Sequence, residues 1–408
     1  TALRESKPAY IEIACNIAAL PCAAPGPISA ILEEDPSDHQ SLHAATNAAA
    51  KFLRNKQKPV ILIGSKLRAA KGEKAAIELA EALGCSVAVM AAAKGFFPED
   101  HPQFAGIYWG EVSTRGAREI VDWSDAVVCI GTIFNDYSTV GWTALPNPRT
   151  TLTVDPDGVS LGDEYFGRVH LHDFLAALAR KVDKRDATMI EYKRIAPERA
   201  PETPAKPEAK LTRAEIMRQL RPLVTPDTSV FLETGDSWFN GIKLDLPRGA
   251  RIESEMQWGH IGWSVPSAFG YAMAAPSRRV IVMVGDGSFQ MTAQELAQMI
   301  RNELPVIIFL INNRGYTIEV EIHDGPYNNI KNWDYAGLVN VFNAEDGRGR
   351  GIRVGKAGEL EDAIKVALEN RDGPTLIECM IDRDDCSAEL ISWGHNVAAA
   401  NGRPPRMV

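Results

Sequence analysis

The sequence predicts an α/β protein of two doubly wound parallel-sheet domains joined by a proline-rich linker. Two observations support this. Short, fully apolar runs alternate with helix-like patterns in both halves of the chain, as strands and crossover helices do in parallel sheets. Between the halves, charged residues are interleaved with Pro197, Pro201, Pro204 and Pro207, and no apolar period survives there.

The first half is expected to be a Rossmann-like central domain. Its strands are so apolar that both faces of the sheet must be covered by helices. The residues after its first strand, Gly64–Ala70, match neither G-x-G-x-x-G nor the P-loop, so a structural role is favoured over nucleotide binding. The expected elements are strands Pro59–Gly64, Ser86–Met90, Ala126–Gly131 and Thr151–Val154, and a helix over Glu73–Leu83.

The second half shows the same alternation more strongly. Ligands of such sheets bind beyond the carboxyl ends of the strands, so we expect the functional residues there. The expected strands are Ser229–Leu232, Arg279–Val284, Pro305–Ile311 and Pro374–Cys379, with helices over Thr292–Asn302 and Glu359–Asn370.

These patterns predict four segments. Residues 28–182 form the central domain, 183–211 the linker, extended in part as polyproline II, and 212–408 the second domain. The segment Lys7–Ile13 reads as a strand, and the turn-rich Pro21–Pro27 ends it. Residues 1–27 are therefore expected to be the tail of a preceding domain and its exit.

Composition excludes several classes of function. In 408 residues there are 44 Lys and Arg against 53 Asp and Glu, a net charge of −9, which argues against nucleic acid as a partner. No apolar run reaches the length of a membrane span. The six cysteines show no CxxC or Cys/His metal spacing, which is typical of reduced thiols in a cytoplasmic protein.

Two strand ends carry polar residues suited to a magnesium diphosphate. Gly285–Ser288 follows the strand that ends at Val284, and Asn312–Tyr316 follows the strand that ends at Ile311. Asp286 and Asn313, 27 residues apart, offer the hard oxygen ligands that Mg2+ prefers. Glycines flanking Asp286 permit close approach of a diphosphate to the backbone. Each motif alone is common in turns, but the two motifs together, at this spacing and on consecutive strands, are specific for a magnesium diphosphate site.

This spacing resembles the signature of thiamine diphosphate enzymes. The resemblance extends over essentially the whole chain and is to the bacterial pyruvate decarboxylases, specifically to their central and diphosphate-binding domains. It is carried by Gly64–Ala70, Met90–Lys94, Phe134–Ser138, Glu233–Asn240, Glu255–Ser264, Gly315–Glu319 and Asp324–Trp333.

The resemblance implies a role for each matching residue. Asp286, Asn313 and the carbonyl of Gly315 would hold Mg2+, and Ile261 would force the two cofactor rings into a V shape. Glu319 would be the catalytic residue that helps release CO2 and donates a proton, and Trp238 would be a wall of the substrate pocket beside it. The cofactor-binding residues would be Thr234, Asp236, Gly259, His260, Ile261, Gly287, Ser288, Asn313, Gly315, Tyr316, Thr317 and Ile318.

The implied reaction is the non-oxidative decarboxylation of pyruvate, or another short 2-oxo acid, to an aldehyde and CO2 through a thiamine diphosphate carbanion and enamine. Two alternatives stay open. One is another thiamine diphosphate enzyme, such as an indolepyruvate or phenylpyruvate decarboxylase or an acetolactate synthase. The other is a non-enzymatic diphosphate-binding or assembly module.

The family also implies partners. In this family the aminopyrimidine ring of the cofactor is held by an N-terminal domain of a neighbouring subunit, and that domain carries a His-His pair. None of the eight histidines in this sequence is adjacent to another. We therefore expect that domain to lie outside these 408 residues, in cis or as a separate chain. A cofactor held between two chains further implies a homo-oligomer, a dimer or a tetramer.

Overall fold

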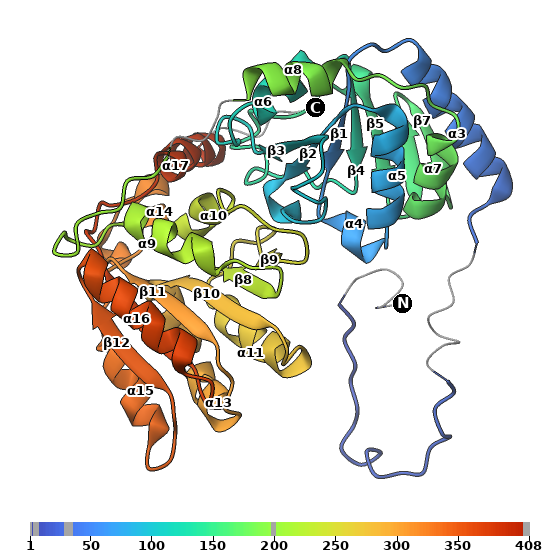
Figure 1. Cartoon of the computed structure of the whole chain (residues 1–408). Helices are drawn as coiled ribbons and strands as arrows, with labels where there is room; N and C mark the ends of the chain where they lie inside the picture. Colours follow the sequence, from blue (N-terminus) through green and yellow to red (C-terminus); the bar gives the residue numbers. More distant parts are fainter. Residues whose placement is uncertain (1, 3–7, 28–35, 197–200, 403–408) are drawn as a thin grey trace.

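The computed structural model describes residues 2, 8–27, 36–196 and 201–402. Two α/β domains lie within them, each built around its own sheet (Figure 1). The predicted fold class is confirmed. Parts of the predicted segments lie outside the described residues, namely 1, 3–7, 28–35, 197–200 and 403–408. Among the described residues, no helix has both the length and the hydropathy needed to cross a membrane.

The central domain contains a sheet in the order β3-β2-β1-β4-β5-β6-β7. The first five strands of this order are parallel, whereas β6 and β7 form an antiparallel hairpin at one edge. The strands are β1 (Pro59–Ile63), β2 (Ser86–Met90), β3 (Phe104–Tyr108), β4 (Ala126–Ile130), β5 (Thr151–Asp155), β6 (Gly158–Leu161) and β7 (Glu164–Gly167).

Helices cover both faces of this sheet. Every residue of β1 is buried, because alternate side chains enter different cores: Ile61 and Ile63 one, Val60 and Leu62 the other. On one side α3, α5 and α7 pack together, and on the other α6 packs against α8 (Figure 1). The helices are α3 (His39–Arg54), α4 (Lys66–Ala69), α5 (Glu73–Leu83), α6 (Ala117–Trp123), α7 (Leu171–Ala179) and α8 (Ala187–Ile195).

The segment predicted as a linker extended in part, 183–211, contains helix α8, so that stretch of it is helical. The Thr188 hydroxyl of α8 donates to the carbonyl of Pro59 at 2.7 Å and accepts from the N–H of Ser86 at 3.0 Å. These bonds attach α8 to the central sheet. Thr188 is the one fully buried residue of α8, which explains why no apolar period is visible in the sequence.

The second domain contains a wholly parallel sheet in the order β12-β13-β11-β10-β8-β9. Helices α9, α16 and α17 share one core with it, and α11, α13 and α15 share the other. The strands are β8 (Thr228–Leu232), β9 (Arg251–Ser254), β10 (Arg279–Gly285), β11 (Ile307–Asn312), β12 (Arg350–Val354) and β13 (Thr375–Met380).

The helix predicted over Thr292–Asn302 is interrupted, and α12 and α13 lie on either side of Ala293 and Gln294. The helices of this domain are α9 (Arg213–Leu220), α10 (Asp236–Gly241), α11 (Ser264–Ala274), α12 (Asp286–Thr292), α13 (Glu295–Arg301), α14 (Thr317–Ile322), α15 (Tyr335–Asn343), α16 (Ala357–Glu369) and α17 (Ala388–Asn401).

The two domains share an aromatic contact. The ring of Trp109 stacks on that of Phe239, with centroids 4.8 Å apart and planes 4° from parallel. The backbone carbonyl of Tyr137 accepts from the indole N–H of Trp109 at 2.7 Å and from that of Trp393, on α17, at 3.0 Å. The Arg68 guanidinium also donates to both carboxylate oxygens of Glu253 at 2.9 Å.

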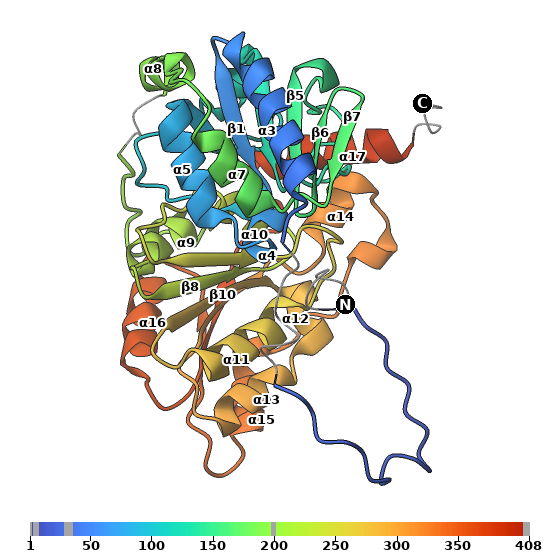
Figure 2. The same ribbon diagram turned by 90° about the vertical axis from the view of Figure 1, so that its right-hand side faces the viewer.

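The expected strand over Lys7–Ile13 is not formed. Lys7 lies outside the described residues, and Pro8–Ile13 is exposed and has no strand geometry. Residues 8–27 extend away from both domains in the two views (Figures 1 and 2). A strand is stable only when a neighbour pairs its N–H and C=O groups, and neither sheet includes this segment.

Candidate active site

A cavity of about 620 Å3 lies at the carboxyl ends of β8, β10 and β11. It is where ligands of parallel sheets are expected to bind. All of the predicted site residues except Trp238 line it. They are Thr234, Asp236, Gly259, His260, Ile261, Asp286, Gly287, Ser288, Asn313, Gly315, Tyr316, Thr317, Ile318 and Glu319.

Asp286 begins α12, directly after β10 ends at Gly285. Its carboxylate accepts from the N–H of Gly287 at 2.8 Å and from that of Arg314, beyond the end of β11, at 2.7 Å. The residue is 1% exposed, and burial raises the pKa of its carboxyl to about 6. Two backbone donors partly compensate the buried charge, and a cation would compensate it further.

Asn313 lies between the other two predicted metal ligands. One terminal atom of its side-chain amide is 3.1 Å from the Gly315 carbonyl oxygen and 3.2 Å from Oδ1 of Asp286. If that atom is nitrogen, it donates to both oxygens; if it is oxygen, three oxygens face one another. Adjacent ligands of an octahedral Mg2+ are about 3.0 Å apart, so these residues fit the metal.

A carboxylate-rich metal site is not present in the described part of the chain, where no group of three His, Cys, Asp or Glu side chains is arranged to hold a metal. The candidate centre therefore depends on one carboxylate, one amide and one backbone carbonyl. Such a set leaves coordination positions for phosphate oxygens, as magnesium sites commonly do.

The start of α12 forms a cradle suited to a diphosphate. A Cβ atom at Gly285 would meet no atom within 4 Å, so the backbone is open there. At Gly287 a Cβ would lie 2.3 Å from the Tyr316 ring, which only glycine avoids. Ser288 adds a buried hydroxyl in the first turn of the helix. The exposed backbone and the helix start together favour an anion.

The loop that carries Gly259, His260 and Ile261 is held by Glu255. The Glu255 carboxylate accepts from the N–H of Trp258 at 2.8 Å and pairs with the His260 imidazole at 2.9 Å. Thr234 donates its hydroxyl to the carbonyl of His260 at 2.8 Å, which fixes the loop to the end of β8. Gly259, with φ +61°, packs so closely against the Tyr137 ring that a Cβ would lie 2.6 Å from it.

Glu319 lies in α14, the short helix that follows the candidate metal loop. Its carboxyl lines the cavity, and burial raises its pKa above the ordinary value for glutamate. Glu319 therefore keeps its proton to a higher pH than a solvated glutamate does. An acid whose pKa is raised in this way is a better candidate for proton donation than a solvated glutamate is.

Asp236 lines the cavity, but its carboxylate is engaged with protein groups. It accepts from the side-chain amide of Asn240 at 2.8 Å and from the N–H and hydroxyl of Ser387. Burial raises the pKa of this carboxyl. Any contact of Asp236 with a diphosphate would therefore fall to its backbone turn.

Trp238 does not line the main cavity, and its place in the substrate pocket stays a prediction. Its side chain is fully buried and contacts Tyr137 and Trp393, with ring centroids 6.4 and 6.3 Å away. It lines a separate cavity of about 220 Å3, between the domains, together with Trp109. The indole therefore packs within the aromatic contact between the domains and does not face the main cavity.

Some cavity residues carry no motif that the sequence reasoning recognised. Arg213, at the start of α9, and Ile381, Asp385 and Cys386, after β13, line the same cavity. The second group could have been found, because the residues follow the carboxyl end of a predicted strand. Arg213 is the first residue of α9, the first helix of the second domain, and nothing in its local sequence indicates that it lines the cavity.

Comparisons with known proteins agree with this geometry. Residues 46–182 match the family model described as thiamine pyrophosphate enzyme, central domain. Residues 226–379 match the model described as thiamine pyrophosphate enzyme, C-terminal TPP binding domain. A solved thiamin diphosphate-dependent enzyme from Mycobacterium smegmatis shares the fold, with a TM-score of 0.63 at 24% identity. The alignment covers 85% of this chain and 64% of that one.

Curated relatives are much more similar. The chain is 59% identical to a probable pyruvate decarboxylase of Schizosaccharomyces pombe and 58% identical to a pyruvate decarboxylase of Neurospora crassa, over 99% of this chain and 71% of each relative. Pyruvate decarboxylase 3 of Arabidopsis thaliana is 48% identical over 99% of this chain and 69% of its own. These relatives are fungal and plant proteins, so the bacterial affinity stays a prediction. The chain belongs to the thiamine pyrophosphate enzyme family, within its pyruvate decarboxylase group.

Proposed function

We propose that the protein is a carboxy-lyase that converts pyruvate to acetaldehyde and CO2 with thiamine diphosphate. The observation that carries this proposal is the convergence of cofactor-type, metal-type and acid residues, from β8, β10, β11 and α14, on a single cavity. The relatives are named for the same activity.

The residues of the cavity fit thiamine diphosphate. Gly287, Ser288 and the turn at Asp236 would hold the diphosphate, and the open backbone at Gly285 leaves room for it. Ile261 would support the bent cofactor, and the carbonyl of Gly259 would accept from its ring amine. When bound, the cofactor supplies the nucleophilic carbon and the electron sink that decarboxylation requires.

Mg2+ is proposed as the companion of the diphosphate. The Asn313 side-chain amide lies 3.1 Å from the Gly315 carbonyl oxygen and 3.2 Å from Oδ1 of Asp286, and this spacing supports the metal, as does the buried charge of Asp286. In this arrangement the metal would connect the ends of β10 and β11 to the diphosphate. The assignment of Tyr316, Thr317 and Ile318 to cofactor contacts is likewise a proposal, supported by their place in the cavity wall.

Glu319 is proposed as the proton donor. Its place in the cavity wall and its raised pKa support this role, in which it would give a proton to the carbon that loses CO2. Ile318 and Ile261 add apolar surface to the same cavity. An apolar surface beside an acid favours a substrate with a small apolar group next to the reacting carbon. Pyruvate has such a group, because a methyl group is attached to its keto carbon.

Partners are proposed from the rim of the cavity. The indole of Trp258 is 78% exposed and the side chain of Met291 is 56% exposed, although both belong to segments that build the cavity. Large exposed apolar side chains at a site indicate a protein surface that covers them. A pyrimidine-binding domain, in cis or as a separate chain, would do so within a dimer or tetramer. The predicted divisions at residues 27, 182 and 211 also stay proposals.

A cytoplasmic location is part of the proposal. The described cysteines form no disulfide, and Cys15 and Cys22 are exposed thiols. Exposed free thiols are typical of reducing compartments.

The test is the rate of acetaldehyde and CO2 formation from pyruvate, with indolepyruvate and phenylpyruvate as competing substrates. The chain would be assayed alone and joined to a pyrimidine-binding domain, each with thiamine diphosphate and Mg2+. We expect turnover of pyruvate in the joined protein and little in the chain alone. Faster turnover of the aromatic acids would reject pyruvate as the substrate. An absence of CO2 release in every arrangement would leave only a binding role.

A further inference from the structure

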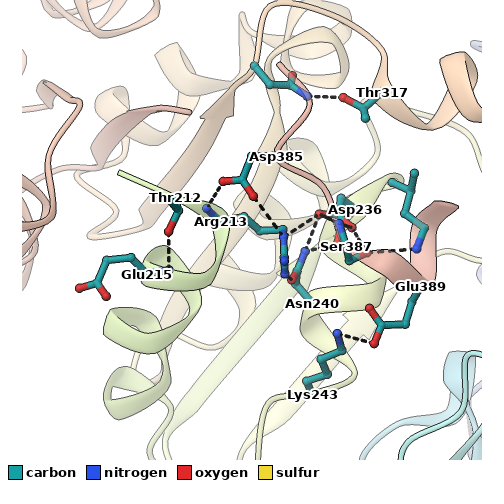
Figure 3. A network of polar contacts seen from close by, with 12 residues as sticks. Thr212, Arg213, Glu215, Asp236, Asn240, Lys243, Thr317, Asp385, Ser387 and Glu389 are labelled. Carbon is teal, nitrogen blue, oxygen red and sulfur yellow. Dashed lines mark hydrogen bonds and ion pairs between the residues drawn. The ribbon is translucent and has the colours of Figure 1, made fainter. Parts of the chain in front are cut away.

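Ser387 is a fully buried residue at the start of α17, and none of the predicted motifs includes it. Its hydroxyl donates to the Asp236 carboxylate and accepts from the N–H of Leu390 at 3.1 Å. Its own N–H donates to the same carboxylate at 3.2 Å. Figure 3 shows the two side chains facing each other. Ser387 thus caps α17 and also binds a residue of the cavity.

The Asp236 carboxylate connects three helices. Asn240 of α10 donates to it at 2.8 Å, and the Arg213 guanidinium of α9 lies 3.7 Å away. Arg213 in turn donates to the Asn240 side-chain oxygen at 2.7 Å, and its N–H donates to Asp385 at 2.7 Å (Figure 3). The contacts form a closed network around one side of the cavity.

The segment before Ser387 is the wall that this network holds. It connects β13 to α17, and Ile381, Asp385 and Cys386 line the cavity. The bonds between Ser387 and Asp236 fix the end of the wall to the turn that follows β8. A displacement of Ser387 would therefore move both the wall and the Asp236 turn.

We propose that Ser387 is a positioning residue for the cofactor cavity, acting through Asp236. Its hydroxyl keeps the 381–386 wall and the Asp236 turn in the arrangement that binds the diphosphate. This inference rests on the proposed function, because the ligand of the cavity is taken to be thiamine diphosphate with Mg2+. The inference gives Ser387 a role in cofactor binding that does not follow from the cofactor motifs or from its capping of α17.

The test combines Ser387→Ala and Asp236→Asn, singly and together, in the full chain. The Kd of thiamine diphosphate in the presence of Mg2+ is measured by titration calorimetry. We expect Ser387→Ala to raise the Kd roughly tenfold, because it removes a hydrogen bond to a charged group. In the Asp236→Asn background the same change should alter the Kd by less than about twofold, since the charged acceptor is already lost.

Asp38→Ala is the matched control. Asp38 caps α3 in the central domain by accepting from the N–H of Ser41 at 2.8 Å. Its loss should lower stability as the loss of a helix cap does, with an unchanged Kd. Equal Kd values for wild type, Ser387→Ala and Asp38→Ala would overturn the inference.

Hydrogen exchange separates this inference from the proposed function. Amide protons of residues 381–387 should exchange faster in Ser387→Ala than in the wild type and Asp38→Ala, with or without cofactor. If the wild-type chain binds no thiamine diphosphate even when it is joined to a pyrimidine-binding domain, the proposed function fails, and the exchange rates still decide the role of Ser387. Unchanged exchange over 381–387 would refute that role, whatever the affinity.

Discussion

The side-chain amide of Asn313 lies 3.2 Å from Oδ1 of Asp286, although the two residues follow different strands. The pairing of β10 with β11, in which Gly285 is opposite Ile311, places both strand ends at one edge of the sheet. Each residue would be an ordinary turn residue alone. Together they form a pair of oxygen-bearing groups at the distance that a shared cation requires.

Asp286→Ala is expected to abolish Mg2+-dependent binding of the cofactor. The carboxylate is the one charged member of the candidate metal set, and loss of a desolvated charged partner costs roughly 2–5 kcal/mol. The Kd of thiamine diphosphate, measured by calorimetry at saturating Mg2+, should rise by about a hundredfold. The control is Asp122→Asn, which alters an exposed carboxylate of α6 paired with Arg118. Unchanged affinity in Asp286→Ala would remove this ligand assignment.

Glu319→Gln is expected to lower kcat by roughly 100- to 10,000-fold, the usual contribution of a positioned acid. Cofactor affinity should change little, because glutamine keeps the size of the side chain. The measurement is steady-state decarboxylation by the protein joined to its pyrimidine-binding domain. A variant with wild-type kcat would exclude Glu319 as the proton donor.

The pH dependence should also report Glu319. Because burial raises its pKa, the folded protein holds this proton to a higher pH than the unfolded chain does. Activity that needs the acid form should decline as pH rises through the raised pKa. Over the same interval the contribution of Glu319 to stability becomes less favourable. Glu319→Gln should lack that part of the pH dependence in urea denaturation, and an identical slope in both proteins would contradict the raised pKa.

Gly287→Ala is expected to destabilise the fold by about 1–3 kcal/mol, because the new methyl group would overlap the Tyr316 ring. Movement of Tyr316 should also weaken diphosphate binding. Gly270→Ala, in the interior of α11, is the matched control, since a Cβ there meets no atom within 4 Å. That control should stabilise the protein by about 0.5–1 kcal/mol. Equal unfolding midpoints for the two variants would show that the cradle tolerates a side chain.

The buried pair of Lys94 and Glu99 offers a test of the domain contact. Its Nζ–Oε1 distance is 2.7 Å, and the Glu99 carboxylate also accepts from the N–H of Leu246 in the second domain at 3.1 Å. Lys94→Met would leave Glu99 buried without its cation, and should destabilise the protein by roughly 3–5 kcal/mol.

The Lys94→Met, Glu99→Gln double variant should recover part of that loss, because the uncompensated charge is gone. Lys74→Met, which breaks an exposed pair with Glu78 on α5, should change stability by less than about 0.5 kcal/mol. The measurement is urea denaturation of the wild type, Lys94→Met, the double variant and Lys74→Met. A Lys94→Met variant as stable as Lys74→Met would show that the buried pair contributes nothing.

Local properties of the chain explain what the sequence reasoning predicted well. Apolar runs such as Pro59–Ile63 have to be buried strands, and polar residues directly after them have to lie at one edge of the sheet. This pattern predicts that Asp286 and Asn313 lie close together, whereas Glu319 and the roles of all three residues are predicted only from the family resemblance. The spacing alone does not distinguish a decarboxylase from other enzymes that use the same cofactor.

Properties that depend on distant packing could not be predicted. The place of Trp238 depends on Tyr137 and Trp393, which come from the other domain and from the last described helix. Helix α8 has only a weak apolar pattern, because the residue that it buries fully is Thr188, while Tyr192 and Ile195 pack against the core only in part. Ser387 resembles any helix cap until its second partner, Asp236, is known.

The carbonyl oxygen of Tyr137, shared by the indoles of Trp109 and Trp393, has a consequence for cooperativity. This acceptor of the central domain satisfies Trp109 of the same domain and Trp393 of α17, so separating the domains would break the hydrogen bond to Trp393. The two sheets should therefore melt together, as one calorimetric transition, despite belonging to different family models. For protein engineering, the unit that can be exchanged between relatives is then the pair of domains. The second domain transplanted alone would lose the stacking of Phe239 on Trp109 and the hydrogen bond from Trp393 to Tyr137.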